Sequence, residues 1–322
     1  MTSIVSNGTS ISIPCYKRQY LKKDDSIDYE EPTLQLMTSW NLLYRLLRHN
    51  FPDKLYHNEI KMICFEQIKN KGQISIHFEG FSKEQRCNLL VGADGLESKT
   101  RRQVLPQISP NYSGYVSWRG LANESEMSSK LLDIFSNKFT FFIGRKTHIL
   151  CYLVPGTNGD ISIGKRRLNW VWYVNTSSEN NTFEKTMTDK DGKFRAYSVP
   201  YGLVNEDIVK QQKDIAEKIL PKSFQQLVFA TREIFIQAIY DLYVPKMVFD
   251  RACLIGDASF IVRPHTAAAT SKAVKNAISL AKSIRQYKED LDTALRIWEK
   301  SQLSLGNYIV SLGIKIGNNL QK

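Results

Sequence analysis

Cysteine is scarce in this chain and never clustered. Five cysteines occur among 322 residues, and no two of them have the C-x-x-C spacing of zinc sites and redox motifs. We therefore expect neither a metal site nor a disulfide framework, and the thiols are expected to be reduced. The five are Cys15, Cys64, Cys87, Cys151 and Cys253.

Long hydrophobic runs are also missing. No stretch of eighteen or more apolar residues occurs, so the sequence predicts no membrane-spanning helix. The N-terminal residues MTSIVSNGTSISIPCYKRQ contain no basic segment followed by an apolar one, so no secretory signal is expected either. The expected location is the cytoplasm.

Glycine forms no dinucleotide fingerprint. No two of the 17 glycines are spaced two apart, so the sequence contains no Gly-x-Gly-x-x-Gly. That motif lets a helix N-terminus hold a pyrophosphate. The usual sequence signal for a complete nucleotide-binding β-α-β unit is therefore absent.

Charge is plentiful but not concentrated. The net charge is +12, yet lysines and arginines are interleaved with acids and form neither a long basic block nor an aromatic-basic ladder. The pattern favours a solvated basic surface and does not indicate nucleic-acid binding. A second reading is that the charge attracts an anionic ligand such as a phosphorylated cofactor.

The length and the 42% content of hydrophobic residues suffice for one large or two modest domains. Residues 1–35 are polar and predict a loop or a peripheral strand pair. Helical spacing from residue 38 to Pro52 predicts an amphipathic helix that Thr38 or Ser39 caps. Helix is also predicted over about 205–227, and over 267–322 as two helices broken near 288–292.

Strand patterns fill the remaining segments. The run QISIHFEGF alternates strictly, and the continuous apolar run Leu89-Leu90-Val91 is typical of a central parallel strand buried on both faces. Residues 112–175 are rich in aromatic and β-branched residues and predict an antiparallel sheet in a second lobe. We expect domains at 1–107, 108–245 and 246–322.

One candidate binding turn lies in the stretch LLVGADGLESKTRR. A buried strand ends at Gly92, and Asp94-Gly95 makes the turn. Ligands of open α/β sheets lie outside the carboxyl ends of the strands, where Asp94 could accept a hydrogen bond from a ligand hydroxyl. Gly95 would let the backbone approach closely. The alternative is that Asp-Gly is simply a common turn dipeptide.

The second candidate turn lies in RACLIGDASFIVRPHTAAATSKA. A strand again ends in a turn with a carboxylate, at Gly256-Asp257, and Pro264 precedes a helix expected to start near Thr266. Free N–H groups and the positive dipole end of that helix suit an anionic group. The small residues Ala267, Ala268, Ala269 and Ala273 would admit a flat ligand, although ordinary helix-sheet packing also favours alanine.

Together these segments resemble the single-component FAD-dependent aromatic hydroxylases. Asp94, Gly95, Ser98 and Arg101 match the family's Asp-Gly-x-x-Ser-x-x-Arg pattern, and LIGDASFIVRPH matches its Gly-Asp segment. The 2,6-dihydroxypyridine 3-monooxygenase branch is the most similar, over roughly residues 33–322. The resemblance implies an α/β fold with an α+β insert: an FAD-binding Rossmann-like domain, an antiparallel substrate domain and C-terminal helices.

The resemblance also implies an activity. FAD, reduced by NADH or NADPH, would react with oxygen to hydroxylate an aromatic or hydroxypyridine-like ring. Asp257, with Gly256, would hold the ribityl hydroxyls, Pro264 would line the flavin, and the helix at Ala267 would stabilise negative charge on it. Asp94 and Arg101 would lie along the cofactor. A small aromatic substrate and oxygen are the expected partners, and the chain is compatible with a homodimer.

Four further residues are weaker candidates. His265 is placed to handle a substrate proton, because its unperturbed pKa lies near neutrality, or else it caps the following helix. Trp118, Arg119 and Tyr240 are candidates for the substrate pocket, although each could equally be a core or surface residue.

The family's N-terminal β-α-β unit is not found in the sequence. By the resemblance, on the order of 70 to 100 residues, two or three βα units, would be missing. Two readings follow: a flavin monooxygenase, inactive if this truncation prevents FAD binding, or a non-catalytic remnant that acts as a binding or interaction protein.

Overall fold

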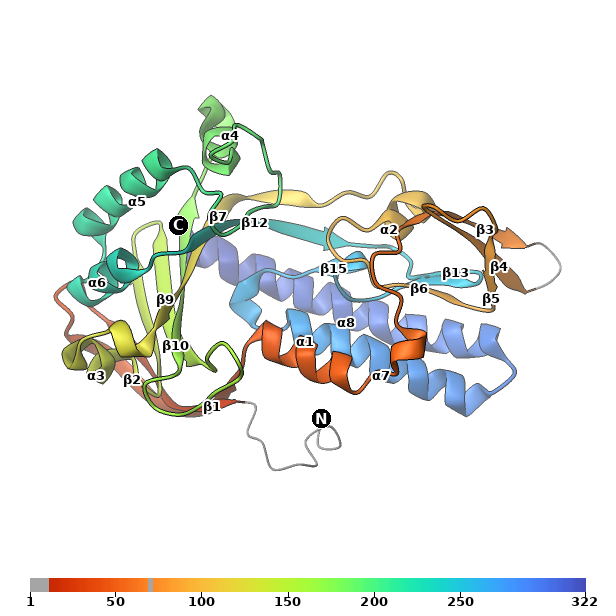
Figure 1. The fold of residues 1–322 in the computed structure, drawn as a ribbon, viewed down its shortest axis with the longest axis horizontal. Coiled ribbons are helices and arrows are strands. Elements are labelled where there is room, and N and C mark those ends of the chain that lie inside the picture. Colours follow the sequence, from red (N-terminus) through yellow and green to blue (C-terminus); the bar gives the residue numbers. More distant parts are fainter. Residues whose placement is uncertain (1–11, 69–71) are drawn as a thin grey trace. The chain divides into compact units, whose positions relative to one another are not determined.

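The described residues, 12–68 and 72–322 of the computed structural model, form two compact units (Figure 1). The sheet unit contains the described residues up to Tyr56, together with Gly114–Ile239 and Leu320–Lys322. The helix-pair unit contains His57–Ser113 and Tyr240–Asn319. Residues 12–56 belong with the large sheet because their first strand pairs with it, and the expected domain boundaries remain predictions.

The sheet unit is built on one long sheet. Its strand order is β11-β12-β7-β10-β9-β8-β1-β2. The pairs β7–β10, β10–β9 and β9–β8 are antiparallel, as the aromatic segments predicted. Strand β1, in contrast, pairs with β8 in parallel. The strands are β1 Ile13–Leu21, β2 Ile27–Met37, β7 Asn111–Asn123, β8 Lys138–Gly144, β9 Thr147–Val154, β10 Arg167–Asn175, β11 Ser198–Val199 and β12 Ile234–Tyr243.

Helices cover one face of this sheet. Trp170 and Trp172 are fully buried on β10, and the Trp170 indole donates to Thr231 Oγ1 at 2.8 Å, just after helix α6. The rings of Phe135 and Phe224 meet edge to face at 5.1 Å, which packs α3 against α6. The helices of this unit are α1 Trp40–His49, α3 Ser129–Phe135, α4 Thr182–Met187, α5 Glu206–Ile219 and α6 Lys222–Ala230.

Two helix predictions in this unit can be compared with the structure. Helix α1 begins where the spacing placed it, and Ser39 is the cap, because its hydroxyl accepts a hydrogen bond from the Leu42 N–H. The helical structure predicted over about 205–227 is present as two helices, α5 and α6. Pro221 separates them, since proline lacks the N–H that would continue α5.

The helix-pair unit contains two small sheets. One has the order β3-β4-β5 and the other β13-β14-β6. A further strand, β15, pairs with Leu242 and Tyr243 at the end of β12. The strands are β3 Met62–Ile68, β4 Gln73–Phe78, β5 Gln85–Cys87, β6 Leu90–Gly92, β13 Val248–Phe249, β14 Ala252–Leu254 and β15 Phe260–Ile261.

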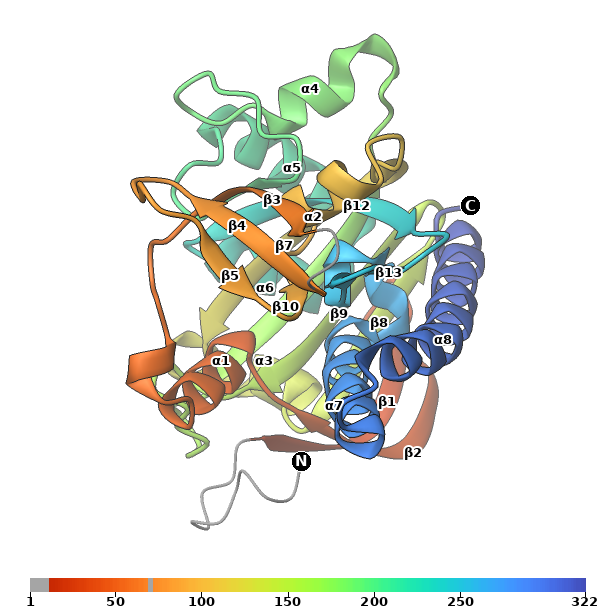
Figure 2. The ribbon, with the colours of Figure 1, turned by 90° about the vertical axis from the view of Figure 1, so that its right-hand side faces the viewer.

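Two long helices complete this unit and confirm the predicted break. Helix α7 spans Ala269–Tyr287 and α8 spans Leu291–Leu320, and they lie side by side in Figure 2. The Trp298 indole on α8 donates to the Asn276 carbonyl on α7 at 3.1 Å. Gly306 lets α8 approach β15 closely, because a Cβ there would clash with the Phe260 ring. Within the described part of the chain, no helix is long and apolar enough to cross a membrane.

Strand β6 only partly matches its prediction. It pairs in parallel with β14, as its apolar run indicated. The expectation that it is central and buried on both faces is wrong for the described residues, because β6 is the last strand of its sheet and Val91 is 38% exposed.

Candidate functional site

Two turns leave neighbouring strands at the same edge of a small sheet. Gly92, the last residue of β6, is paired with Leu254, the last residue of β14, and the Ile255 N–H donates to the Gly92 carbonyl at 3.0 Å. The Asp94 turn follows β6, and the Asp257 turn follows β14. The structure therefore brings the two predicted turns together within the helix-pair unit.

The Asp94 carboxylate is engaged inside its own turn. It accepts hydrogen bonds from the Ser98 hydroxyl at 2.6 Å and from the N–H and hydroxyl of Thr100 at 2.9 and 3.0 Å. Partial burial alone would raise the pKa of Asp94, but these hydrogen bonds outweigh it and hold the pKa below its usual value. Gly95 has a φ of +70°, which glycine adopts without strain. Asp94 thus shapes the start of helix α2, Lys99–Val104.

Arg101 joins the two turns. Its side chain is buried, and its guanidinium donates to the Leu96 carbonyl at 2.7 Å and to the Ala258 carbonyl at 3.1 Å. Leu96 belongs to the first turn and Ala258 to the second. Arg101 therefore fixes the spacing of the turns, and its predicted position along a cofactor stays a prediction.

The Asp257 carboxylate, unlike that of Asp94, faces outward. The Asp257 side chain is 47% exposed, and one oxygen accepts from the Lys272 ammonium at 3.1 Å. Gly256 has a φ of +63°, and its N–H donates to the Asn276 side-chain oxygen at 3.1 Å. This turn presents a carboxylate that a ligand hydroxyl could reach.

Helix α7 begins three residues later than expected. Pro264–Thr266 form a 3-10 turn, and Ala267 then adopts a left-handed conformation with φ of 51°, so that α7 starts at Ala269. Ala268 occupies the N-cap position and makes no side-chain capping bond, and the first turn contains no acid. The start of α7 is thus available to an anionic or electron-rich group.

These features fit the middle of an FAD molecule. A half-exposed carboxylate suits ribityl hydroxyls, and an uncapped helix end suits negative charge on a flavin ring. Lys272 and Asn276 of α7 both bond the Gly256–Asp257 turn, so the carboxylate and the helix start belong to one rigid arrangement.

His265 lies in the chain between the Asp257 turn and the start of α7, and its surroundings change its pKa. Burial, and then the positive charge of Arg263, lowers the pKa of His265 to about 4. The imidazole is therefore neutral at pH 7 and a weaker base than its unperturbed pKa implied. The proposed proton-handling role of His265 remains a prediction, with a smaller basicity than the sequence indicated.

A buried ion pair that the sequence reasoning missed supports this segment. Arg263 donates to both oxygens of Asp241 at 2.7–3.1 Å and to the Asn318 side-chain oxygen at 2.8 Å. The Ser113 hydroxyl also donates to Asp241 at 3.0 Å. The pair ties the Pro264 turn to β12 and α8. Only its position before the proline could have drawn attention to Arg263.

Neighbouring substrate candidates in the sheet unit point to opposite faces. Trp118 is buried on the face that Gly120 and Trp170 share, under the helices. Arg119 lies on the other face, because successive strand residues alternate. Its guanidinium donates to the Gln237 side-chain oxygen at 2.8 Å and lies 5.6 Å from the Phe235 ring centre.

The face that carries Arg119 is lined with aromatic rings. His148 stacks between Phe141 and Tyr173, at 5.8 and 5.5 Å between ring centres. Burial raises the pKa of Tyr152 and Tyr173 above their usual values, while the Arg119 charge opposes that rise, so both phenols are neutral. We call this set the aromatic face: Phe139, Phe141, His148, Tyr152, Tyr173 and Arg119. Strand alternation was the signal that could have identified His148.

Tyr240 belongs to the helix-pair unit. It is half-buried, and its ring lies 5.6 Å from the ring of Tyr112. Its predicted substrate contact remains a prediction, as do those of Trp118 and Arg119.

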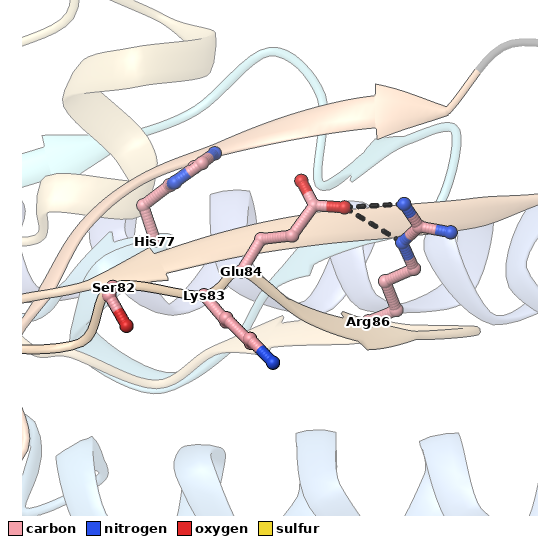
Figure 3. A pocket seen from close by; sticks show the side chains of 5 residues that line it. All are labelled: His77, Ser82, Lys83, Glu84 and Arg86. Carbon is pink, nitrogen blue, oxygen red and sulfur yellow. Dashed lines mark hydrogen bonds and ion pairs between the residues drawn. The ribbon is translucent and has the colours of Figure 1, made fainter.

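A surface hollow elsewhere in the helix-pair unit contains none of these residues (Figure 3). Its lining is polar, and Glu84 accepts hydrogen bonds from Ser75 and Arg86, which lower the pKa of Glu84. These partners already satisfy its carboxylate, so the hollow offers no comparable site. The lining residues are His77, Ser82, Lys83, Glu84 and Arg86.

Sequence comparison identifies relatives over nearly the whole chain. A family model described as "FAD binding domain-like" matches residues 112–241. The chain is 31% identical over 316 residues to the 2,6-dihydroxypyridine 3-monooxygenase of Paenarthrobacter nicotinovorans, and the match covers 97% of this chain and 76% of that protein.

Solved structures resemble this fold. The 2,6-dihydroxypyridine-3-hydroxylase of Arthrobacter nicotinovorans matches with a TM-score of 0.92 at 29% identity, over 99% of this chain and 80% of that one. HpxO of Klebsiella pneumoniae, solved with FAD and uric acid, matches with a TM-score of 0.75 at 18% identity, over 98% and 74% of the two chains. At that identity the second match shows the fold alone.

Proposed function

The chain belongs to the FAD-dependent aromatic hydroxylases, and from that premise we propose that it binds FAD at the Asp257 turn and hydroxylates an aromatic ring. The observation that carries the proposal is the Asp257 carboxylate, half exposed beside the uncapped start of α7. Gly256 keeps the backbone of this turn in a left-handed conformation, which orients the carboxylate. Pro264 and Ala267–Ala269 form the segment against which the flavin ring would lie.

We propose that NADH or NADPH is the electron donor. Bound FAD supplies the chemistry that this donor and oxygen require: one oxygen atom enters the ring, and the other leaves as water. The residues of this chain bind and orient the reactants. The uncapped N–H groups of α7 would stabilise negative charge on the flavin, and Arg101 would maintain the spacing of the two turns.

The substrate proposed is an electron-rich aromatic or hydroxypyridine-like ring. Its support is the aromatic face of the sheet unit, which combines rings for stacking with the Arg119 cation. Because the phenols of Tyr152 and Tyr173 are neutral, they can donate hydrogen bonds to a ring oxygen, and Arg119 can pair with one that is ionised. The relative named for 2,6-dihydroxypyridine supports this substrate class. The comparisons do not favour the non-catalytic alternative.

The test is a flavin titration of the whole chain. FAD is added to the purified protein, and binding is followed by quenching of flavin fluorescence and by the absorbance band near 450 nm. We expect binding in the wild type and a loss of affinity of about tenfold or more in Asp257→Ala, because a hydrogen bond to a charged group is lost. Asp214→Ala, which removes an exposed acid on α5, is the matched control.

A positive titration is followed by turnover. Hydroxypyridines are added with NADH or NADPH, and the hydroxylated product and oxygen consumption are measured together. Equal FAD affinity in the wild type and Asp257→Ala would contradict the proposed site. FAD binding without product from any hydroxypyridine would contradict the substrate class.

A further inference from the structure

Lys272, in the first turn of α7, is a buried cation within the Asp257 turn. Its side chain is 0% exposed. The ammonium donates to the Gly256 carbonyl at 3.0 Å, to Asp257 Oδ1 at 3.1 Å and to the Phe260 carbonyl. An ammonium group has three N–H donors, and each of them has an acceptor here.

A lysine at this position is costly unless its charge is used. Burial lowers the pKa of Lys272, because it disfavours the charged form, and the Asp257 carboxylate opposes that shift. An apolar side chain could fill the same volume without the desolvation penalty. Ordinary helix-sheet packing therefore does not explain the lysine.

The three acceptors identify what the charge does. Gly256 and Phe260 lie at the two ends of the turn, so their carbonyls fix its backbone, while the third bond restrains the rotation of the Asp257 side chain. Asp257 Oδ1 is held inward, and the side chain nevertheless remains 47% exposed. The carboxylate is thus oriented, with part of its surface left for a ligand.

Other contacts do not replace this arrangement. The Asn276 side chain bonds only the Gly256 N–H in this turn, and its amide nitrogen donates to Gln302 Oε1 at 2.8 Å. Arg101 donates to the Ala258 carbonyl from the opposite turn. Among the hydrogen bonds found in the described residues, Lys272 alone contacts the Asp257 carboxylate from another element.

We propose that Lys272 is a positioning residue for FAD: it holds the Asp257 carboxylate in the orientation that accepts a hydrogen bond from a cofactor hydroxyl. The inference rests on the proposed FAD site and deepens it. Lys272 contacts the cofactor only through Asp257, so its effect on FAD affinity depends on that carboxylate.

The test is a double-mutant cycle on FAD affinity. The dissociation constant is measured by fluorescence quenching for the wild type, Lys272→Met, Asp257→Asn and the double variant, at a temperature well below every apoprotein melting point. We expect Lys272→Met to weaken FAD binding about 10- to 100-fold, the range for a lost charge-assisted hydrogen bond. The double variant should bind within about twofold of Asp257→Asn, because the two residues act as one unit.

Two controls separate positioning from folding. Lys275→Met removes an exposed lysine one turn along α7 and should leave FAD affinity unchanged. Apoprotein melting temperatures report any purely structural loss. If Lys272→Met does not fold, Lys272→Gln, which keeps a donor but no charge, takes its place in the cycle.

The outcomes are distinguishable. No FAD binding in the wild type would overturn the proposed function, and with it this inference. FAD binding that Lys272→Met leaves unchanged, or effects of the two substitutions that simply multiply, would overturn the positioning role alone.

Discussion

The Asp94 and Asp257 turns follow paired parallel strands and look alike in sequence, yet their carboxylates do different things. Asp94 accepts three hydrogen bonds within its own turn, from Ser98 and Thr100. Within the described part of the chain, Asp257 accepts one hydrogen bond, from Lys272 on the next helix, and remains half exposed. The first carboxylate builds local structure, while the second is held in place and left accessible. The comparison shows that an Asp-Gly or Gly-Asp turn becomes a candidate site only when its carboxylate is not consumed internally.

Removing the link between the turns should have the largest effect. Arg101→Met would leave the Leu96 and Ala258 carbonyls without their donor inside a buried environment, so we expect the free energy of unfolding to fall by about 3 kcal/mol. Denaturant unfolding measures the change. Arg102→Met, on the exposed side of the same helix, is the control and should change little. Equal stability of Arg101→Met and wild type would show that the turns do not depend on this link.

Substituting the two carboxylates should separate their roles. Asp94→Ala loses the acceptor for Ser98 and Thr100, so we expect about 1–2 kcal/mol of destabilisation, comparable to the loss of a helix cap. Asp257→Asn should destabilise the apoprotein less, because its side chain is half exposed and its amide oxygen still accepts a hydrogen bond from the Lys272 ammonium. Thermal melts of both apoproteins test the order of the two effects. The reverse order would mean that Asp257, and not Asp94, is the structural carboxylate.

Replacing Gly95 of the first turn should lower the free energy of unfolding less than replacing Asp94 does. Gly95 has a φ of +70° and nothing within 4 Å of an added Cβ, so Gly95→Ala introduces backbone strain without a clash. We expect a loss of about 1 kcal/mol, measured by denaturant unfolding. A loss of several kcal/mol would indicate a packing role that the open space around Gly95 does not predict.

Lowering the pH should reduce the contribution of Asp94 to the free energy of unfolding, and we expect this effect to be the smallest of those considered. Because the pKa of Asp94 is lower in the folded protein than in the unfolded chain, its ionised form stabilises the fold at neutral pH. That contribution should be lost as the pH falls below about 4, the unfolded value, and through the folded pKa. Unfolding free energies of the wild type and Asp94→Asn across this range measure it. The difference between the two proteins should shrink with acid, and a constant difference would contradict the assignment.

Local patterns predicted much of the fold. Helical spacing located α1, α7 and α8, and the aromatic alternation located the antiparallel strands. The resemblance to FAD-dependent aromatic hydroxylases and the α/β fold are confirmed by the relatives. The position of β6 was misjudged because an apolar run reports the character of a strand and not how many neighbours it has. Helix was also predicted over about 205–227, where α5 and α6 lie, but the break at Pro221 was not.

The contacts within the site could be predicted less well. Periodicity identified Asp94 and Asp257 equally, since both follow apolar runs. It could not reveal that Thr100 donates hydrogen bonds to the Asp94 carboxylate, whereas Lys272 donates to that of Asp257. Lys272 is 15 residues from Asp257 in sequence, and Arg263 is 22 from Asp241, so these pairings depend on how the elements pack. The lowered pKa of His265 likewise could not be predicted from the sequence, because it depends on the burial of that side chain.

The most direct test of this account compares the FAD affinity of Asp94→Ala and Asp257→Ala under conditions in which both apoproteins are folded. The account predicts that Asp257→Ala weakens binding about tenfold or more, the effect of a lost charge-assisted hydrogen bond, and that Asp94→Ala weakens it much less. Equal losses in both variants, or a larger loss in Asp94→Ala, would contradict the assignment of one turn to structure and the other to the cofactor.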